Sequence, residues 1–360
     1  MLFTTLQTSS WHLSNRVVMS PLTRSRATQN NLPTALMAAY YGQRATAGLI
    51  ITEGTSPSPN GLGYPRIPGL FNAAQVVGWK QVTDAVHFKG GKIVVQLMHT
   101  GRVTHSANLP AGAEVLGPSA DLCPGEMFTD SQGLQPHSTP RAMTQADITS
   151  TVGEYVQSAK LAIEAGFDGV ELHAANGYLI EQFLNANVNK RTDGYGGSIE
   201  GRNRFALEVA RATGAAIGAD KVGMRISPHG VMGSTGTFPE VDAQYLALTH
   251  ALSSLGLTYL HVLDHSALGT PPVPEETKKS LRAAFNGTFI LAGGFDHDSA
   301  EAALAQGRAD LIAFGRPFIA NPDWVARMQS SAPGNDLDMS TFYTPGPKGY
   351  TDYPTLGAAT

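Results

Sequence analysis

The sequence predicts a single (β/α)₈ barrel, and three observations support this fold class. The chain has 360 residues, of which 42% are hydrophobic and 15% charged, so it can bury one large α/β core. One pattern recurs along it: a helix-like segment, a glycine, a short apolar run, and then abruptly polar or glycine-rich residues. Segments that fit a strand of this kind occur eight times, the number that a closed parallel barrel requires.

In chain order, each expected strand lies within one short segment. The eight segments are NRVVMSP (15–21), ATAGLIITEGT (45–55), GKIVVQLMH (91–99), EAGFDGVELHA (164–174), KVGMRIS (221–227), SLGLTYLHVLD (254–264), GTFILAGG (287–294) and AQGRADLIAFGR (305–316). Their apolar runs are short and nearly continuous, which is typical of parallel strands covered on both faces. In the clearest copies we expect Gly48, Gly166, Gly256 and Gly307 to end the preceding helix, because a left-handed C-cap costs glycine little.

Helices are predicted where apolar residues recur at steps of three and four. One such stripe comprises Ile148, Val152, Tyr155, Val156, Ala159, Ala162 and Ile163. Thr144 precedes this stripe and is its expected N-cap. A second stripe comprises Val241, Tyr245, Leu248, Leu252 and Leu255.

Two segments interrupt the alternation of strands and helices. Residues 100–143, between the third strand and its helix, are rich in Pro, Gly and Ser and too long for a plain βα connection. We expect a lid or hairpin over the barrel mouth there. The tail, residues 331–360, is turn-rich and aromatic and is expected to pack on the barrel. No linker is evident, so residues 1–360 are predicted to form one domain.

Composition favours a small-molecule ligand. The net charge is −4 and the 25 Lys and Arg are dispersed, which argues against nucleic acid or an anionic membrane as partner. The single cysteine, Cys123, excludes an intrachain disulfide, and DLCPGEM places no base beside it, so we interpret it as a passive thiol. The first residues lack a basic segment followed by a long apolar one, and no 18-residue apolar run occurs. We therefore expect a cytoplasmic protein.

The C-terminal ends of the strands carry the catalytic face of such a barrel. In strand order they supply Pro21, Leu22 and Thr23; Glu53, Gly54 and Thr55; Gln96, Met98 and His99; His173, Asn176 and Tyr178; Arg225; His261 and Asp264; Gly293 and Gly294; and Gly315 and Arg316. Most are hydrogen-bonding groups, not carboxylates. The glycines after strands seven and eight, together with Arg316, predict a phosphate site.

Several chemistries compete for these residues. The histidines available to a metal are His99, His173, His261 and His265. A hydrolytic barrel of that kind needs a His-x-His pair on its first strand, and no histidine lies between His12 and His87, so no metal site is expected. No G-x-S-x-G elbow and no G-x-G-x-x-G turn follow a strand. Redox chemistry on a mononucleotide flavin fits best, and a barrel lyase acting on a phosphorylated sugar stays open as an alternative.

Six long stretches carry a family resemblance. They are residues 15–27, 40–55, 93–102, 169–205, 312–323 and 349–354. Taken in order, they resemble the Old Yellow Enzyme family of flavin-dependent ene-reductases over nearly the whole chain, apart from 100–143 and the last few residues. The resemblance implies bound FMN, reduction by NADPH, and reduction of the C=C bond of an enone, enal, maleimide or nitroalkene.

The resemblance also assigns catalytic roles. His173 and Asn176 match the pair that hydrogen-bonds the substrate's carbonyl or nitro oxygen, where two fixed donors stabilise the charge that grows as hydride arrives. Tyr178 matches the proton donor, since a phenol with a pKa of about 10 stays protonated at neutral pH. The same pair would hold the nicotinamide carboxamide, so one pocket would serve both half-reactions.

For the cofactor, the resemblance implies that Thr23 contacts flavin O4, and that Gln96 and Arg225 face the pyrimidine edge. From the residues alone, Thr23 in a simple turn and a Gln96–Arg225 pair inside the barrel remain alternatives. The other expected contacts are Pro21, Leu22 and Gly54 along the ring, and Gly293, Gly294, Gly315 and Arg316 on the phosphate.

Three further residues are expected to shape the substrate pocket. Tyr64 and Tyr343 resemble pocket aromatics of the family. Met98 is a departure, because many relatives carry tryptophan there, and a flexible side chain predicts a wider or more adaptable pocket. The expected partners are an activated alkene and NAD(P)H, with the protein a monomer or homodimer. An isomerase, a nitroester reductase and a pure binding module remain alternatives.

Overall fold

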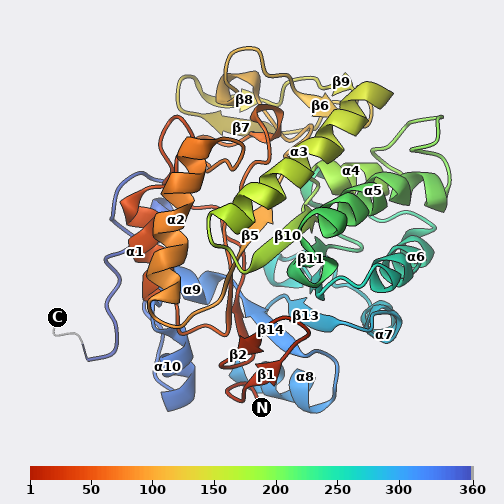
Figure 1. Cartoon of the computed structure of the whole chain (residues 1–360). Helices are drawn as coiled ribbons and strands as arrows, with labels where there is room; N and C mark the ends of the chain where they lie inside the picture. Colours follow the sequence, from red (N-terminus) through yellow and green to blue (C-terminus); the bar gives the residue numbers. More distant parts are fainter. Residues whose placement is uncertain (358–360) are drawn as a thin grey trace.

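The computed structural model describes residues 1–357, and its centre is a closed barrel of eight parallel strands with helices outside it (Figure 1). The strands are β3 (Val17–Met19), β4 (Leu49–Ile51), β5 (Ile93–Leu97), β10 (Gly169–Ala174), β11 (Val222–Ile226), β12 (Tyr259–Leu263), β13 (Thr288–Ala292) and β14 (Leu311–Phe314). Each lies inside one of the eight segments expected to hold a strand. The predicted (β/α)₈ barrel is therefore confirmed.

Helices alternate with these strands along the chain. The α-helices are α1 (Ala35–Gln43), α2 (Ala73–His87), α3 (Gln145–Glu164), α4 (Leu179–Leu184), α5 (Ile199–Ile217), α6 (Val241–Ser254), α7 (Glu275–Ala284), α8 (His297–Ala305), α9 (Arg316–Ala320) and α10 (Trp324–Ser330). The 3₁₀ turns are η1 (Pro59–Gly61), η2 (Ser106–Asn108), η3 (Ala219–Lys221), η4 (Met232–Ser234), η5 (Ser266–Leu268) and η6 (Met339–Thr341). Among residues 1–357, no helix combines the length and apolar character that a membrane crossing needs.

Helix boundaries follow the local sequence in most of the barrel. Thr144 caps α3 as expected, and with Asp147 it forms a reciprocal capping box. Gly166, Gly256 and Gly307 adopt positive φ after their helices, as predicted. Gly48 does not, and there the prediction is wrong. A Cβ on Gly48 would collide with the Asn15 carbonyl, so close backbone approach requires this glycine.

The strand register brings distant polar side chains to one level of the barrel. His173 pairs with Arg225, and Arg225 pairs with His261 on the next strand. Glu171 pairs with Gln96 one step lower. The opposite end of the barrel is apolar and includes Trp11, which follows β1 (Leu6–Gln7) and precedes β2 (His12–Leu13).

The segment between β5 and α3 contains the expected hairpin. Its strands are β7 (Glu126–Thr129) and β8 (Gly133–Pro136), which pair antiparallel. The short strands β6 (Leu116–Gly117) and β9 (Arg141–Ala142) pair parallel at its base. Met127 on β7 belongs to a buried cluster packed against Tyr64 and Tyr178. The hairpin therefore reaches the strand ends, while a lid function stays a prediction.

The tail runs beside α1 before it ends, and residues 358–360 of the predicted segment lie outside the described part (Figure 1). Tyr350 stacks on Tyr40 with ring centroids 4.0 Å apart. Two buried arginines, Arg24 and Arg26, donate to backbone carbonyls of residues 341–349. These contacts fix the tail against the first βα connection.

Candidate active site

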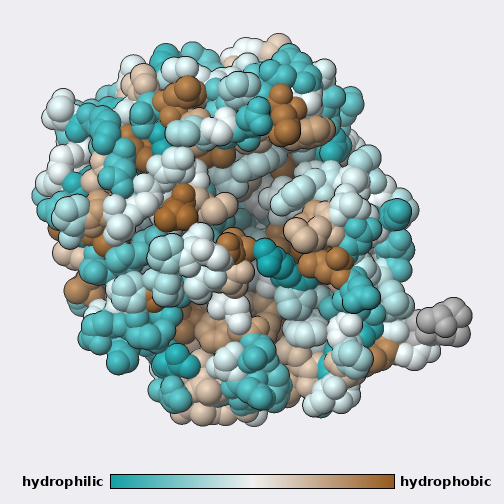
Figure 2. All heavy atoms as spheres, turned by 180° about the vertical axis from the view of Figure 1, so that it is seen from behind, coloured by the Kyte–Doolittle hydropathy of each residue, from teal (hydrophilic) through white to brown (hydrophobic). Residues whose placement is uncertain are grey.

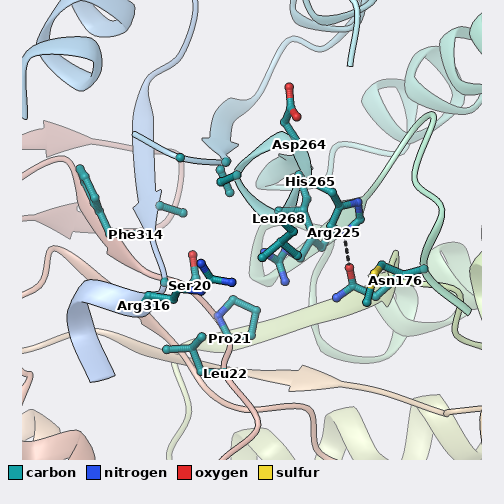
Figure 3. Close-up of a pocket in the computed structure, with 18 of the residues that line it drawn as sticks. Ser20, Pro21, Leu22, Asn176, Arg225, Asp264, His265, Leu268, Phe314 and Arg316 are labelled. Atoms are coloured by element: carbon teal, nitrogen blue, oxygen red, sulfur yellow. Dashed lines mark hydrogen bonds between the residues drawn. The ribbon is translucent and has the colours of Figure 1, made fainter. Parts of the chain in front are cut away.

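A cavity of about 500 Å³ lies at the C-terminal ends of the strands, where the sequence places the functional residues. Ten of the predicted site residues line it: Pro21, Leu22, Tyr64, Asn176, Tyr178, Arg225, Gly293, Gly294, Gly315 and Arg316. In the view of Figure 3, Pro21 and Leu22 lie between Arg316 on one side and Asn176 on the other. The volume is in the range of ordinary ligand and cofactor pockets.

The turn after β10 directs Asn176 and Tyr178 toward this cavity. Asn176 and Gly177 adopt φ of 60° and 76°, a conformation that asparagine and glycine tolerate best, and α4 begins directly afterwards. The Gly177 N–H donates to the Glu181 carboxylate at 2.5 Å. The Asn176 N–H donates to Ser227 Oγ at 3.0 Å, and Ser227 donates to Glu181 at 2.9 Å. Buried hydrogen bonds thus hold the turn in one shape.

His173 and Asn176 lie next to each other, and Asn176 is the one of the two that lines the cavity. Asn176 Nδ2 and His173 Nε2 are 3.4 Å apart, a long separation for a hydrogen bond. His173 is buried, and burial first, then the charge of Arg225, hold its pKa well below the usual value, so the ring is neutral. His173 Nδ1 is buried and has no hydrogen-bond partner within residues 1–357. The pair can therefore still bind an oxygen atom of a ligand.

Tyr178 presents a protonated hydroxyl to the same cavity. Its OH lies 2.9 Å from the Tyr64 OH, and its ring contacts His173 edge-on with centroids 5.1 Å apart. Burial and then the neighbouring Tyr64 raise the pKa of Tyr178 well above 10. Burial also raises the pKa of Tyr64 to about 12. Both phenols consequently keep their protons at neutral pH, and both line the cavity.

Arg225 is the cation on this side of the cavity. It is 5% exposed, and its Nε has no partner among the described residues. Burial lowers the pKa of Arg225, but an arginine stays charged in proteins. A buried guanidinium with an unused donor is suited to an electron-rich edge of a cofactor.

Gln96 is fixed by a buried carboxylate below the cavity. Its Nε2 donates to Glu171 at 2.8 Å, and His261 Nδ1 lies 2.9 Å from the other oxygen of the same carboxylate. Burial raises the pKa of Glu171, but His261 and Arg225 outweigh it and the net pKa is lowered. Gln96 thus pairs with Glu171, not with Arg225, which was one alternative from the sequence.

Glycine is required on the opposite side of the cavity, after β13. Gly293 and Gly294 have φ of 135° and 69°, where a side chain would be strained. A Cβ on Gly293 would also collide with the Asp264 carbonyl. Gly315 follows β14 and leads into Arg316, whose side chain is exposed at the cavity edge. The backbone of these glycines and the Arg316 guanidinium thus line the part of the cavity where the sequence predicts a phosphate.

The remaining predicted residues, His173 among them, lie outside the cavity lining. Thr23 follows Leu22 and is half-buried, and Gln96 lies beneath the floor. Gly54 packs directly against the Met98 side chain, which leaves no room for a Cβ. Tyr343 is 60% exposed, and only its carbonyl is held, by Arg66 at 2.9 Å. Its assignment to the pocket stays a prediction.

Sequence reasoning missed several residues of the cavity wall. They are Ser20, Val103, Met232, Gly233, Leu263, His265, Ala267, Leu268, Ala292, Phe295, Ala313, Phe314 and Pro317. His265 Nε2 lies 2.7 Å from Asn176 Oδ1, the contact drawn dashed in Figure 3. The sequence had offered His265 only as a metal ligand. Within residues 1–357, no three His, Cys, Asp or Glu side chains gather as metal ligands would.

Apolar side chains are exposed on the segments around the strand ends. Met232 and Leu268, which also line the cavity, are 41% and 49% exposed, and Phe128 and Leu134 stand on the hairpin. Figure 2 shows apolar residues, in brown, bordering a hollow on the face opposite that of Figure 1.

The polar groups of this cavity fit FMN. Arg225 and His173 hold buried atoms without partners in the described chain, and these can meet the polar edge of a flavin ring or of a ligand above it. The glycines after β13 and β14, with Arg316, can meet a phosphate. Pro21 and Leu22 supply apolar contacts between the two.

Comparison with known proteins agrees with this assignment. The model of the NADH:flavin oxidoreductase / NADH oxidase family matches residues 1–335. Chanoclavine-I aldehyde reductase of Penicillium roqueforti (strain FM164) is 43% identical, with 98% of this chain and 95% of that protein covered. For 12-oxophytodienoate reductase 7 of Oryza sativa subsp. japonica the identity is 41%, covering 99% and 95%.

Solved structures give the same result. Morphinone reductase in complex with tetrahydroNAD superposes with a TM-score of 0.94 and 45% identity, covering 99% of this chain and 98% of that one. An old yellow enzyme homologue from Zymomonas mobilis gives a TM-score of 0.95 and 39% identity, covering 99% of both chains. The protein is therefore an FMN-dependent oxidoreductase on a TIM barrel. It belongs to the Old Yellow Enzyme family, as the sequence resemblance predicts.

Proposed function

We propose that the protein is an NADPH-dependent ene-reductase that reduces the C=C bond of α,β-unsaturated carbonyls, maleimides or nitroalkenes. The observation that carries this proposal is the arrangement of Asn176, the Tyr178 hydroxyl and Arg225 around one cavity, with the His173 ring in contact with Asn176 and Tyr178. Two nitrogen groups able to bind an oxygen and one protonated phenol are what reduction of a polarised alkene requires.

His173 and Asn176 bind the carbonyl or nitro oxygen of the substrate in this proposal. As negative charge grows on that oxygen, N–H donors fixed by the folded chain stabilise it without having to reorganise. The neutral state of His173, imposed by burial and Arg225, lets the ring act as a hydrogen-bond donor and not as an acid. Loss of one donor is expected to cost about 3 kcal/mol of transition-state stabilisation, as for an oxyanion-hole donor.

Tyr178 donates the proton to the α-carbon. Its raised pKa keeps the hydroxyl protonated until a carbanionic carbon is present. The Tyr64 hydroxyl, 2.9 Å away, orients it and is the nearest group that can exchange a proton with it.

The cofactor side of the cavity uses the other predicted residues. Thr23, Gln96 and Arg225 would contact the flavin ring, with Pro21, Leu22 and Gly54 along its plane. The phosphate would be held by Gly293, Gly294, Gly315 and Arg316. When bound, FMN supplies the two-electron chemistry that links nicotinamide oxidation to alkene reduction. Arg225, a fixed positive charge, favours the more negative reduced state of the ring.

One pocket serves both substrates in turn, so the kinetics are expected to be ping-pong. His173 and Asn176 would hold the carboxamide of the nicotinamide and, after it leaves, the oxygen of the alkene substrate. The morphinone reductase complex with tetrahydroNAD supports a nicotinamide site in this family. NADPH is proposed as the preferred donor, and a comparison of its kcat/KM with that of NADH tests this choice.

The decisive experiment is a visible spectrum followed by an anaerobic titration. The purified protein is expected to be yellow, to bleach on addition of NADPH, and to regain its colour when 2-cyclohexenone is added. A colourless protein that binds a phosphorylated sugar would contradict the flavin assignment. A bleached protein that no enone, maleimide or nitroalkene reoxidises would contradict the ene-reductase activity.

A further inference from the structure

His265 is the one histidine of the cavity wall that contacts Asn176 through the amide oxygen. It lies two residues after the end of β12, is 5% exposed, and lines the cavity together with Asn176. The distance from His265 Nε2 to Asn176 Oδ1 is 2.7 Å, a short and well-formed hydrogen bond. Because an amide oxygen can only accept, His265 Nε2 must carry the proton and donate it.

The backbone of Asn176 is fixed, but the orientation of its side-chain amide is not fixed by the backbone. Its N–H is held by Ser227 Oγ at 3.0 Å, and its φ of 60° is fixed by the turn. A half-turn of the amide would exchange oxygen and nitrogen at almost no steric cost. With Oδ1 held by His265, Nδ2 stays directed away from His265 (Figure 3). Nδ2 remains 3.4 Å from His173 Nε2.

We infer that His265 is a positioning residue for the reaction: its Nε2–H holds the Asn176 amide with the NH₂ group presented to the substrate's oxygen. This inference rests on the proposed function, in which Asn176 binds that oxygen. Without His265, the amide populates both orientations, and in one of them its carbonyl opposes the substrate's carbonyl or nitro oxygen.

The two substrates of the pocket differ in how they depend on this orientation. The oxygen of an enone can only accept hydrogen bonds, so it requires the NH₂ group of Asn176. The carboxamide of nicotinamide carries both a donor and an acceptor, so it can rotate to match either orientation of the asparagine. His265 therefore matters for alkene reduction and much less for oxidation of NADPH.

The test measures the two half-reactions separately in the FMN-loaded enzyme. In His265→Leu, which keeps bulk but removes the donor, kcat/KM for 2-cyclohexenone is expected to fall about tenfold, the value of one hydrogen bond. Flavin reduction by NADPH should change by less than about twofold, since the carboxamide adapts. His265→Gln retains an N–H at a similar reach and should restore most of the enone activity. His229→Leu, which removes a histidine bonded to Asp242 and not to Asn176, is the matched control.

A double-variant cycle distinguishes positioning from a general structural role. In an Asn176→Ala background, His265→Leu should lower kcat/KM for 2-cyclohexenone by less than about a further twofold. The reason is that the amide which His265 orients is then absent. Equal losses in both backgrounds, or equal losses in both half-reactions, would overturn the inference. Should His265→Leu not retain FMN, His265→Ser replaces it in the same cycle.

The outcome also separates this inference from the proposed function. If Asn176→Ala slows enone reduction but His265→Leu leaves it unchanged, His265 has no positioning role and the proposed function stands. If Asn176→Ala itself leaves enone reduction unchanged, both are overturned.

Discussion

At the scale of single residues, the chemistry depends on environments that the fold imposes on Tyr178 and His173. Both side chains are ordinary in isolation, one phenol and one imidazole. Burial shifts their pKa values in opposite directions, upward for Tyr178 and downward for His173, and each shift favours the neutral form. A neutral imidazole and a protonated phenol side by side give the site hydrogen-bond donors without a fixed charge at that point.

Replacing Tyr178 by phenylalanine tests the proton transfer. Removal of a general acid is expected to slow enone reduction by about 100-fold or more, while flavin reduction by NADPH changes little. Stopped-flow measurement of the two half-reactions checks this. Tyr353→Phe, in the tail and outside the cavity lining, is the control and should leave both rates unchanged. Equal slowing of both half-reactions in Tyr178→Phe would show that the hydroxyl acts in binding and not in proton transfer.

The sequence predicts the residues of one turn well and their distant partners poorly. His173, Asn176 and Tyr178 lie within six consecutive positions after a recognisable strand, so their common location follows from the local pattern. His265 meets Asn176 across 89 positions, and Glu171 meets Gln96 across 75. Such contacts depend on barrel closure and strand register, which residue spacing alone does not specify.

At the scale of elements, buried arginines hold the tail in place by donating hydrogen bonds to backbone carbonyls that no helix or strand pairs. Arg26 is 4% exposed and donates to the carbonyls of Phe342, Thr341 and Lys348 at 2.6, 2.8 and 3.0 Å. The composition of the tail predicts that it packs, but arginines in a segment following a strand are usually on the surface. The anchoring residues could therefore not be identified from the sequence.

Arg26→Ala is expected to destabilise the protein by about 3 kcal/mol, because several buried carbonyls lose a charged donor at once. Arg26→Lys should recover only a part, since an ammonium lacks the planar fork that reaches three carbonyls. Equilibrium unfolding in urea measures both variants. Arg211→Ala, at an exposed position of α5, is the control and should be close to neutral.

Arg66 connects the hairpin, the tail and the segment that follows β3. Its guanidinium pairs with Asp130 at the tip of the hairpin and donates to the carbonyls of Tyr343 and Ser25 at 2.9 and 3.2 Å. If the hairpin acts as a lid, Arg66→Ala should increase amide hydrogen exchange in residues 126–136 while global stability falls by less than about 1 kcal/mol. Unchanged hydrogen exchange in the hairpin would show that Arg66 does not hold the hairpin closed. Lys80→Ala, which breaks an exposed pair with Asp84, is the control.

At the scale of the whole molecule, the barrel was predictable because its eight units repeat one pattern, and each repeat reinforces the others. The exception at Gly48 illustrates the limit: its sequence context matches the other copies, but contact with Asn15 from a different unit decides its conformation. Likewise, the hairpin after β5 is expected from the length of its segment, whereas its contact with Tyr178 follows only from tertiary packing.

Burial within this barrel also makes stability depend on pH in two opposing ways. Burial lowers the pKa of His99 to about 3 and of His265 to about 4, so the unfolded chain binds more protons there and stability rises as pH rises toward 6.5. Burial raises the pKa of Glu53 and of Glu181 from 4.5 to about 7. For these two carboxyls the folded chain binds more protons, so their contribution is fully present below 4.5 and is lost as pH rises through 7.

Glu53→Gln isolates the carboxyl contribution, because the histidine contributions are the same in both proteins and cancel. Glu53 accepts hydrogen bonds from the Arg24 N–H and the Tyr41 hydroxyl, and the amide oxygen of glutamine can accept them too. A pKa rise from 4.5 to about 7 corresponds to roughly 3 kcal/mol, so the variant should gain up to that amount relative to the wild type between pH 4.5 and 8. Urea unfolding at several pH values measures the difference, with Glu200→Gln on the exposed face of α5 as control. A constant difference across this range would show that Glu53 is ionised in the folded protein throughout, held so by Arg24 and Tyr41 despite its burial.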